Sequence, residues 1–490
     1  MTGAVPKDAA AVILLRPNTD PQNPEVYWVR RSEKLAFLGG YHAFPGGQLD
    51  AGDAEVDVRN APDPTTAAMI SGAARELFEE LGVLATRSGD TLTKGQRVSI
   101  LDDLESGRMS WPSLLKHYEL YLDANDFTFV GRWVTPPFNA RRFDTWFFLV
   151  TCPAKQEPYL TAGELDQGEW ITAHDAYERW LRDEVVAVPP TLHALRTLAA
   201  GLTPNLVERF LSLDNARGEI ARRITFRPNY ICFPVRTPTR PPATHTCCYL
   251  IHTPEELLIV DPGSPYEDEQ QALAECVDDM IAEGRRVRAI VITHLHPDHI
   301  GGVNALQAHL GPDVPIAAHP LTAEALTDIH VDQLINDGDV ITLAGDRPVT
   351  LKALHTPGHA RGHLCFHDAD RGALLTGDNI VGVGSVLIDP PEGNMRVYLD
   401  SLERMRALPN LSVLFGGHGP AIATPYKKIG EYISHRLERE QNILQAVREG
   451  ATDPKQIVAK VYTDVSPKAH AMAERAVLAH LDKLRDDGAI

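Results

Sequence analysis

The sequence is poor in cysteine and in long hydrophobic runs. Its six cysteines lie at positions 152, 232, 247, 248, 276 and 365, and none forms a Cys-x-x-Cys pair or a dense cluster. A disulfide-stabilised secreted domain is therefore not expected, and a reducing cytoplasm suits this cysteine usage best. The longest apolar run near the start, Ala9 to Leu15, is too short for a membrane span and lacks the flanks of a signal peptide. We expect a cytoplasmic protein that has no membrane partner.

Positive charge is scarce as well. The chain carries 47 lysine and arginine residues against 66 aspartate and glutamate residues, which gives a net charge of −19 at pH 7. Such a chain has no general attraction to nucleic acid or anionic membranes. A local basic groove is compatible with this balance, so RNA stays among the candidate partners beside small-molecule nucleotide or thioester substrates. The sequence does not indicate the oligomeric state.

The length of 490 residues predicts two or three domains, because single cores rarely grow to that size. Apolar runs at Ala9 to Leu15 and Val26 to Val29, joined by a turn rich in Pro, Asn and Asp, predict a β-hairpin. A helical pattern from about Thr66 to Leu81 stops at a glycine, and Trp146 to Val150 returns to a strand. We expect an α+β domain over residues 1–205.

A second domain is expected around a Pro-rich, basic stretch, and we place its bounds at 222–425. Short strand patterns alternate there with helical runs, which suggests sheets covered by helices. The strands are expected at Cys248 to Ile251, Leu257 to Val260, Ala289 to Ile292 and Ala373 to Leu375, and the helices at Glu267 to Glu283 and Asn304 to Leu310. Beyond it the pattern is almost wholly helical, in segments 426–449, 454–462 and 467–486, which predicts a small helical domain over 426–490.

A cluster of histidines follows one of these strands. Residues 291–299 read Val-Ile-Thr-His-Leu-His-Pro-Asp-His. The strand period of two makes His294 and His296 project the same way, while Asp298 and His299 turn toward a second, adjacent ion. Neutral imidazole and carboxylate ligands suit zinc, or iron and manganese where oxygen ligands weigh more. Taken alone, the segment could also be a solvent-exposed, histidine-rich turn.

Four further motifs favour the metal site. They are His355-Thr-Pro-Gly-His359, Thr376-Gly-Asp378, Gly416-Gly-His418-Gly-Pro, and Asp261-Pro-Gly263 after an apolar strand. Glycine lies beside each of these side chains, so the backbone can approach an ion closely. The whole constellation predicts a dinuclear metal site. We interpret His355 and His363 as structural or supporting histidines, because two ions already have full ligand sets.

This half of the chain resembles the metallo-β-lactamase superfamily, an αββα sandwich with its metal site at the edge of two sheets. The resemblance covers about residues 240–425 and implies two Zn²⁺ ions, or Fe or Mn, that activate the attacking water. It implies ligands at His294, His296 and His359 for one ion, at Asp298, His299 and His418 for the other, and at Asp378 for both. Asp298 is also a catalytic candidate, and Asp261 would orient the ligands.

Within the superfamily this half is most similar to glyoxalase-II-like thioesterases and to the lactamase-beta-like endoribonuclease branch. The segments Thr246-Cys-Cys-Tyr-Leu250 and His435 to Gln441 support the second branch, in which a winged-helix-like domain follows the catalytic one. Little room for a wing is expected before Ile490. An activated water can attack a carbonyl or a phosphorus, so ester, thioester and phosphodiester substrates all stay open.

A second motif, Arg75-Glu-Leu-Phe-Glu-Glu-Leu-Gly-Val83, lies in the predicted helix of the first half. Glu76, Glu79 and Glu80 stand at positions i, i+3 and i+4, so their carboxylates share one helix face. Such a cluster repels itself without a counter-ion and suits Mg²⁺ or Mn²⁺, which could bridge to substrate phosphates. An exposed acidic helix face is the alternative.

Together with Phe44-Pro-Gly-Gly47 upstream, this helix resembles the Nudix hydrolase family. The resemblance implies metal ligands at the three glutamates, a catalytic role for Glu80, and cofactor-binding roles for Gly47 and Arg75. Asp53 stands where the family has glutamate, and the stretch from Asp53 to Arg75 is longer than usual. A similar insertion occurs in the coenzyme-A diphosphatase branch, which residues 131–136 and 141–148 also resemble.

The predicted fold class is an α+β Nudix domain, then an αββα metallo-β-lactamase sandwich, then a small C-terminal helical, winged-helix-like domain. The expected function is a metal-dependent hydrolase with two sites. The first half would cleave a nucleoside-diphosphate-linked substrate such as coenzyme A or acyl-CoA. The alternative is a single-strand-specific endoribonuclease whose Nudix half only binds or senses a nucleotide.

Overall fold

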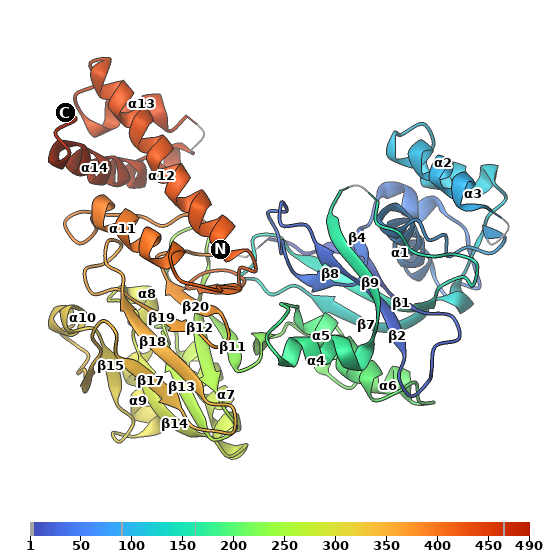
Figure 1. Cartoon of the computed structure of the whole chain (residues 1–490), viewed down its shortest axis with the longest axis horizontal. Helices are drawn as coiled ribbons and strands as arrows, with labels where there is room; N and C mark the ends of the chain where they lie inside the picture. Colours follow the sequence, from blue (N-terminus) through green and yellow to red (C-terminus); the bar gives the residue numbers. More distant parts are fainter. Residues whose placement is uncertain (1–3, 90–91, 162, 464–465) are drawn as a thin grey trace. The chain divides into compact units, whose positions relative to one another are not determined.

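The computed structural model describes residues 4–89, 92–161, 163–463 and 466–490. The chain forms two compact units, of which the first ends at Pro228 and the second runs from Asn229 to Ile490. In Figure 1 the first unit is coloured from blue to green, and the second from yellow-green to red. Each unit has its own hydrophobic cores and is described by itself.

The first unit is built on one mixed sheet. Its strands are β1 (Lys7–Leu15), β2 (Glu25–Arg31), β3 (His42–Ala43), β4 (Gly46–Gln48), β7 (Thr128–Val134), β8 (Phe143–Thr151) and β9 (Leu165–Thr172). They follow the order β3-β2-β1-β8-β7, with β4 beside β1 and β9 beside β2. The predicted hairpin is present, because β1 and β2 pair antiparallel with Leu14 opposite Tyr27. Three short strands complete the unit: β5 (Val58–Arg59), β6 (Leu122–Asp123) and β10 (Ile224–Arg227).

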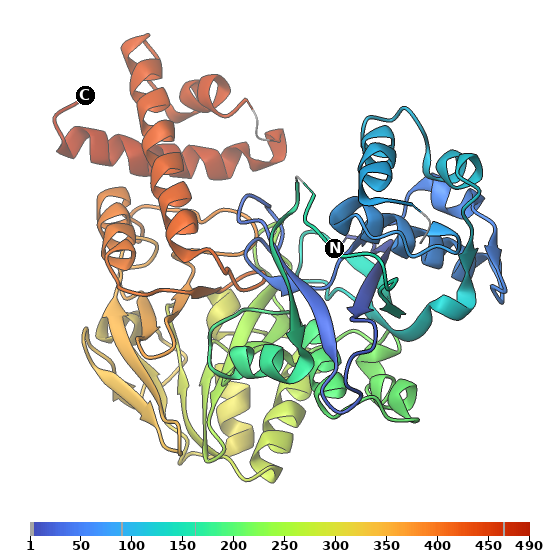
Figure 2. The ribbon, with the colours of Figure 1, turned by 45° about the vertical axis from the view of Figure 1, so that its right-hand side comes forward.

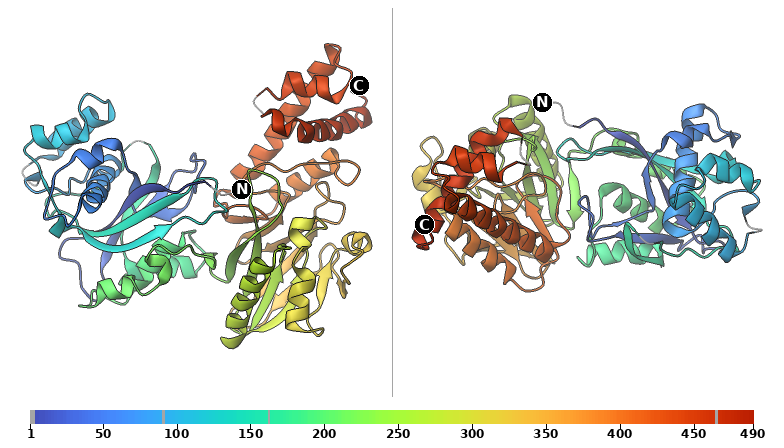
Figure 3. Two further views of the ribbon diagram at one scale, coloured as in Figure 1. Left: turned by 180° about the vertical axis from the view of Figure 1, so that it is seen from behind. Right: turned by 90° about the horizontal axis from the view of Figure 1, so that it is seen from above.

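Helices cover both faces of this sheet (Figures 1 and 3). They are α1 (Pro64–Leu81), α2 (Lys94–Glu105) and α3 (Trp111–His117) on one face, and α4 (Ala173–Leu181), α5 (Pro189–Ala199) and α6 (Leu206–Phe210) on the other. The two faces follow from the strand period of two. Val12 and Leu14 of β1 join the core under α1, whereas Ile13 and Leu15 join the core under α5.

Helix α1 matches the predicted helix closely. It begins two residues earlier than expected, because Asp63 caps it by accepting a hydrogen bond from the backbone N–H of Thr66 and Pro64 occupies its first turn. It ends at Gly82, whose φ of 60° is left-handed and favours glycine. The first unit extends beyond the predicted limit at residue 205, because Phe210 of α6 is buried in its core.

The second unit contains two sheets. Within residues 229–490, the first has the order β11 (Tyr230–Arg236), β12 (His245–His252), β13 (Glu256–Val260), β14 (Arg286–Val291), β15 (Ile316–Ala318), β16 (Gln333–Leu334). The second has the order β17 (Val340–Leu343), β18 (Val349–His355), β19 (Leu364–Asp368), β20 (Ala373–Gly377), β21 (Val413–Gly416). Aromatic rings pack between the sheets, with the ring centroids of Tyr230 and Phe415 stacked 4.9 Å apart.

Helices lie on the outer faces of both sheets, which gives the predicted αββα sandwich (Figure 2). The helices before the C-terminal region are α7 (Glu267–Ala282), α8 (Pro297–Ile300), α9 (Val303–Leu310), α10 (Pro320–Ala325) and α11 (Met395–Arg406). Leu273 of α7 and Leu306 of α9 pack on the first sheet, and Leu402 of α11 packs on the second. The strands β14, β18, β20 and β21 each end within a few residues of a histidine or aspartate of the sequence motifs.

The C-terminal region consists of α12 (Pro425–Arg448), α13 (Pro454–Val461) and α14 (His470–Asp486). Its separation from the sandwich at residue 426 is not observed, because Ile429 and Ile433 of α12 lie in the same core as α11. Only the second half of α12, with Ile443 and Leu444, forms a separate core with α13 and α14. In the part of the chain that the structure describes, none of the helices has the length and apolarity to cross a membrane.

Candidate metal centre

Three histidine side chains converge near the ends of β14 and β18. His294 and His296 follow β14, and His359 lies in the loop after β18. The Nδ1 atom of His296 lies 3.0 Å from Nε2 of His294 and 2.9 Å from Nε2 of His359. One proton can join only one of these nitrogen pairs, whereas a cation can accept lone pairs from all three rings. This trio is the first ligand group.

Asp298, His299 and His418 form the second ligand group. The first two lie on α8, and His418 follows β21. The Nδ1 atoms of both histidines lie within hydrogen-bond distance of a carboxylate or backbone oxygen. Nδ1 of His299 lies 2.8 Å from a carboxylate oxygen of Asp261, and Nδ1 of His418 lies 2.8 Å from the carbonyl oxygen of His245. With Nδ1 engaged in this way, both Nε2 atoms face the centre.

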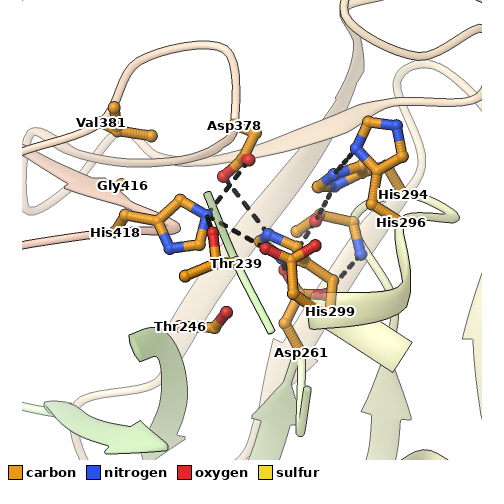
Figure 4. A network of polar contacts seen from close by, with 12 residues as sticks. Thr239, Thr246, Asp261, His294, His296, His299, Asp378, Val381, Gly416 and His418 are labelled. Atoms are coloured by element: carbon orange, nitrogen blue, oxygen red, sulfur yellow. Dashed lines mark hydrogen bonds and ion pairs between the residues drawn. The ribbon is translucent and has the colours of Figure 1, made fainter. Parts of the chain in front are cut away.

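Asp378 lies between the two groups, as Figure 4 shows. Its Oδ1 is 3.3 Å from Nε2 of His299, and its Oδ2 is 3.3 Å from Nε2 of His418 and 3.9 Å from Nε2 of His359. Oδ1 of Asp378 and Nε2 of His299 are buried without a hydrogen-bond partner. Gly417 permits this approach, since a Cβ atom there would lie 2.3 Å from Oδ1 of Asp378.

The loop after β13 orients these ligands. Besides contacting His299, the Asp261 carboxylate accepts hydrogen bonds from the Thr293 backbone N–H at 2.8 Å and its hydroxyl at 2.6 Å. The next glycine is required by packing, since a Cβ on Gly263 would lie 1.8 Å from the carbonyl oxygen of Asp298. Asp261 therefore fixes the base of the centre, in the orienting role that the resemblance implies.

The electrostatics of the donor set fit bound cations. Burial lowers the pKa of His294 well below its usual value and that of His359 to about 3, so both rings are neutral and offer lone pairs. Burial alone would also lower the pKa of His418, but the charge of Asp378 raises it to about 9. Burial would raise the pKa of Asp378, but His418 and His299 hold it well below its usual value. The ionised carboxylate thus requires compensating positive charge, which divalent cations would supply.

The other two histidines of this region support the loops. Nε2 of His363 accepts a hydrogen bond from the backbone N–H of Asp378 at 3.2 Å, and its Nδ1 lies 3.1 Å from the Thr356 hydroxyl. His355 stacks on His319, with ring centroids 4.0 Å apart. Neither His363 nor His355 belongs to a ligand group of the described residues, in agreement with their interpretation from the sequence.

A cavity of about 550 Å³ opens onto the centre. Its walls include residues that the sequence motifs did not indicate, namely those of the loop 238–243, of the segment 381–392, and Met472 and Arg475 of α14. These segments lie far apart in the chain and carry no metal-binding spacing. Only the fold brings them together.

The predicted carboxylate helix of the first unit is organised around Arg75. This buried guanidinium donates to the Asp53 carboxylate at 2.9 Å, to Glu76 at 3.0 Å and to Glu79 at 2.7 Å. The longer stretch between Asp53 and Arg75 is accommodated by a turn of 3-10 helix (Ala51–Glu55), by β5 and by the first turns of α1. The insertion therefore leaves the contact of Arg75 with Asp53 intact, while the cofactor-binding role of Arg75 stays a prediction.

The two glycines of β4 pack against the same helix. Oε2 of Glu80 accepts a hydrogen bond from the backbone N–H of Gly46 at 2.9 Å, and a Cβ on Gly47 would lie 2.6 Å from the Glu76 carboxyl group. Glu76, Glu79 and Glu80 do not close into one group of three ligand atoms among the described residues. Burial raises the pKa of Glu76 to about 7 and that of Glu80 to about 8.

The comparisons with known proteins place the second unit in a family. The family model of the metallo-beta-lactamase superfamily matches residues 242–418, and that of the beta-lactamase associated winged helix domain matches residues 454–490. An atrochrysone carboxyl ACP thioesterase of Aspergillus chevalieri is 31% identical over 240 residues, which are 46% of this chain and 71% of that protein. A beta-lactamase-like protein 2 homolog of Caenorhabditis elegans is 28% identical over 246 residues, which are 50% of this chain and 80% of that protein.

Among solved structures, a NUDIX hydrolase from Alicyclobacillus acidocaldarius is 32% identical with a TM-score of 0.35, and the match covers 41% of this chain and 95% of that one. The two ligand groups, the αββα sandwich and the sequence relatives agree for the second unit. The chain belongs to the metallo-β-lactamase superfamily and is a metal-dependent hydrolase.

Proposed function

We propose that the metal centre hydrolyses acyl thioesters. The observation that carries this proposal is the pair of ligand groups around Asp378, at a cavity whose walls combine apolar and polar side chains. Val381, Val386 and Met472 line that cavity and suit an acyl chain. The relative from Aspergillus chevalieri is named a thioesterase, which favours a carbonyl over a phosphorus as the electrophile.

The proposal assigns a role to each residue of the metal centre. His294, His296 and His359 would hold one ion, Asp298, His299 and His418 the other, and Asp378 both. When bound, two Zn²⁺ ions, or Fe or Mn, supply Lewis acidity toward the carbonyl and lower the pKa of water. The oxygen of one water molecule would form the new C–O bond at the acyl carbon while the C–S bond breaks, and a proton of that water would pass to the leaving thiolate. Asp261 would keep His299 oriented throughout.

The test removes two ligands from the same group. The wild-type chain is expected to contain close to two ions of zinc, iron or manganese and to release free thiol from an acyl thioester. His294→Ala with His296→Ala should lose most of the metal, and its activity should fall by more than the roughly 10–100-fold loss typical of removing an outer-shell partner. Elemental analysis and a thiol assay measure both.

A matched control replaces two exposed histidines of the same unit, as His309→Ala with His330→Ala, which lie in neither ligand group. This control should keep its metal and its activity. Full metal retention by the His294 and His296 double variant would contradict the ligand assignment. Cleavage of single-stranded RNA by the wild type without thioester loss would replace the thioesterase proposal by the ribonuclease alternative.

We further propose that the first unit is a Nudix-type hydrolase that cleaves a nucleoside-diphosphate-linked substrate, such as coenzyme A or an acyl-CoA. The supporting observation is the packing of Gly46 and Gly47 of β4 against Glu76 and Glu80. Mg²⁺ or Mn²⁺ held by this helix face would offset the mutual repulsion of the carboxylates and contact the diphosphate. Glu79→Gln with Glu80→Gln should abolish this cleavage.

A further inference from the structure

One arginine on the cavity wall has no protein partner. Arg240 lies in the loop between β11 and β12, its side chain is exposed, and none of the described residues forms a hydrogen bond or ion pair with it. Arg240 lines the same cavity as the ligands His296 and Asp298. A molecule bound in this cavity can therefore meet both the guanidinium and the metal centre.

A second arginine reaches the same cavity from α14. Nε of Arg475 donates to the Asp389 carboxylate at 2.5 Å, and Nη2 donates to the carbonyl oxygen of Pro390. These bonds hold the guanidinium against the segment 381–392 and leave the Nη1 group available, because a guanidinium has five N–H donors. Arg475 is thus a fixed cation on the wall.

The carboxylates on the rim are already engaged. Asp389 is paired with Arg475, and Glu392 accepts a hydrogen bond from the backbone N–H of Arg361 at 2.8 Å. The remaining wall combines polar side chains with apolar ones, among them Val381, which is labelled in Figure 4. A ligand of this cavity therefore meets apolar side chains, the metal centre and one uncompensated cation.

We propose that Arg240, assisted by Arg475, binds an anionic group of the substrate, so that the centre acts on acyl thioesters carrying a carboxylate or phosphate that lies in the same cavity as the thioester carbonyl. The planar guanidinium suits the two oxygens of such a group. The inference rests on the proposed thioesterase function for its substrate, but the binding of the anion can be measured without turnover.

The experiment uses the full, metal-loaded chain and three thioesters of similar size. S-butyryl-N-acetylcysteamine is neutral, S-glutaryl-N-acetylcysteamine carries a carboxylate on the acyl side, and S-butyryl-3-mercaptopropionate carries one on the thiol side. One of the charged thioesters should be favoured about tenfold in kcat/KM, mainly through KM, and the favoured one identifies the side that carries the anion. Arg240→Ala should reduce this preference to about one, and Arg240→Lys should retain part of it.

The control variant is Arg406→Ala, an arginine of α11 outside the cavity, which should keep the full preference. Calorimetry of glutarate against butyrate gives a second readout, since each can place one carboxylate on the metal and only glutarate has another for Arg240. Glutarate should bind about tenfold more tightly to the wild type and no more tightly than butyrate to Arg240→Ala.

The outcomes separate the two proposals. If all three thioesters react equally and glutarate binds no better than butyrate, the anion subsite is wrong while the thioesterase function stands. If no thioester reacts but the glutarate preference depends on Arg240, the subsite stands and the thioesterase function fails. If Arg240→Ala reduces only the cleavage of single-stranded RNA, with no effect on glutarate, the acyl-anion proposal is overturned.

Discussion

At the residue scale, burial decides the ionisation of the groups in both sites. In the metal centre it keeps His294 and His359 neutral, and it leaves Asp378 ionised only because cationic partners surround it. In the first unit the Gly46 backbone N–H and the charge of Arg31 offset the burial of Glu80 only in part. Burial, and then the charge of Glu76, raise the pKa of Glu80 to about 8.

This shift predicts that the metal-free first unit loses stability as pH rises. The folded state keeps a proton on Glu80 that the unfolded state, with a pKa near 4.5, releases. The free energy of unfolding should therefore fall between about pH 5 and pH 8. All six tryptophans lie in the first unit, at positions 28, 111, 133, 146, 170 and 180, so tryptophan fluorescence during urea unfolding of the full chain reports on this unit alone.

Glu80→Gln should reduce the pH dependence, because glutamine accepts the Gly46 hydrogen bond without titrating, and the raised pKa of Glu76 accounts for what remains. Glu105→Gln, at the exposed end of α2, is the control and should leave the slope unchanged. Added Mg²⁺ should stabilise the wild type most at high pH, where the carboxylates are ionised. A pH profile of Glu80→Gln identical to that of the wild type would show that Glu80 is not the titrating group.

At the element scale, strand β4 sets the position of the α1 carboxylates. Its two glycines serve different contacts. A Cβ on Gly46 would lie 2.3 Å from the carbonyl oxygen of Ala10 in β1, whereas a Cβ on Gly47 would meet only the end of the Glu76 side chain. At Gly46 an added Cβ would clash with the backbone of β1, which cannot move aside. At Gly47 it would clash with the flexible carboxyl group of Glu76, which can move.

The two glycines should therefore give different phenotypes. Gly46→Ala is expected to destabilise the first unit by about 1–3 kcal/mol, since its φ of 153° also favours glycine. Gly47→Ala should leave the urea midpoint almost unchanged while it displaces Glu76 and weakens Mg²⁺ binding. Tryptophan fluorescence and calorimetry with Mg²⁺ measure the two effects. Equal losses of stability in both variants would show that the Gly47 contact is structural only.

At the scale of the whole molecule, the two sites lie on different compact units and share no residue. Their activities should therefore be separable. Glu79→Gln with Glu80→Gln is expected to abolish Mg²⁺- or Mn²⁺-dependent diphosphate cleavage and to leave thioester hydrolysis intact, and Asp298→Ala should do the reverse. Product analysis by mass spectrometry with acetyl-CoA follows both reactions in one sample, through free thiol and adenosine 3′,5′-bisphosphate.

The loss of both activities in a folded Asp298→Ala variant would contradict two independent sites. The unmodified chain with metal removed by a chelator and restored separately as Zn²⁺ or Mg²⁺ is the matching control. Zn²⁺ should restore thioester hydrolysis, and Mg²⁺ should restore diphosphate cleavage, because nitrogen ligands dominate one site and carboxylates the other.

The candidate ligands of the metal centre and the main elements could be predicted from the sequence, with the ligand roles implied by the resemblance of the motifs. His294, His296, Asp298 and His299 lie in one turn after one strand, so their spacing reports a local geometry that the chain must adopt. The same holds for α1, whose length, cap and glycine stop are local signals. The lactamase-type sandwich follows from such signals together with the resemblance of its motifs.

The tertiary structure alone decided what surrounds these ligands. Arg240, Val381 and Arg475 carry no shared pattern and lie in three distant segments, yet they line one cavity. The union of α12 with the sandwich core was likewise invisible, because an amphipathic helix does not indicate which core its apolar face will meet. Sequence spacing therefore determined the donor atoms, and long-range packing determined the cavity in which they act, because contacts between distant segments leave no periodic signal in the chain.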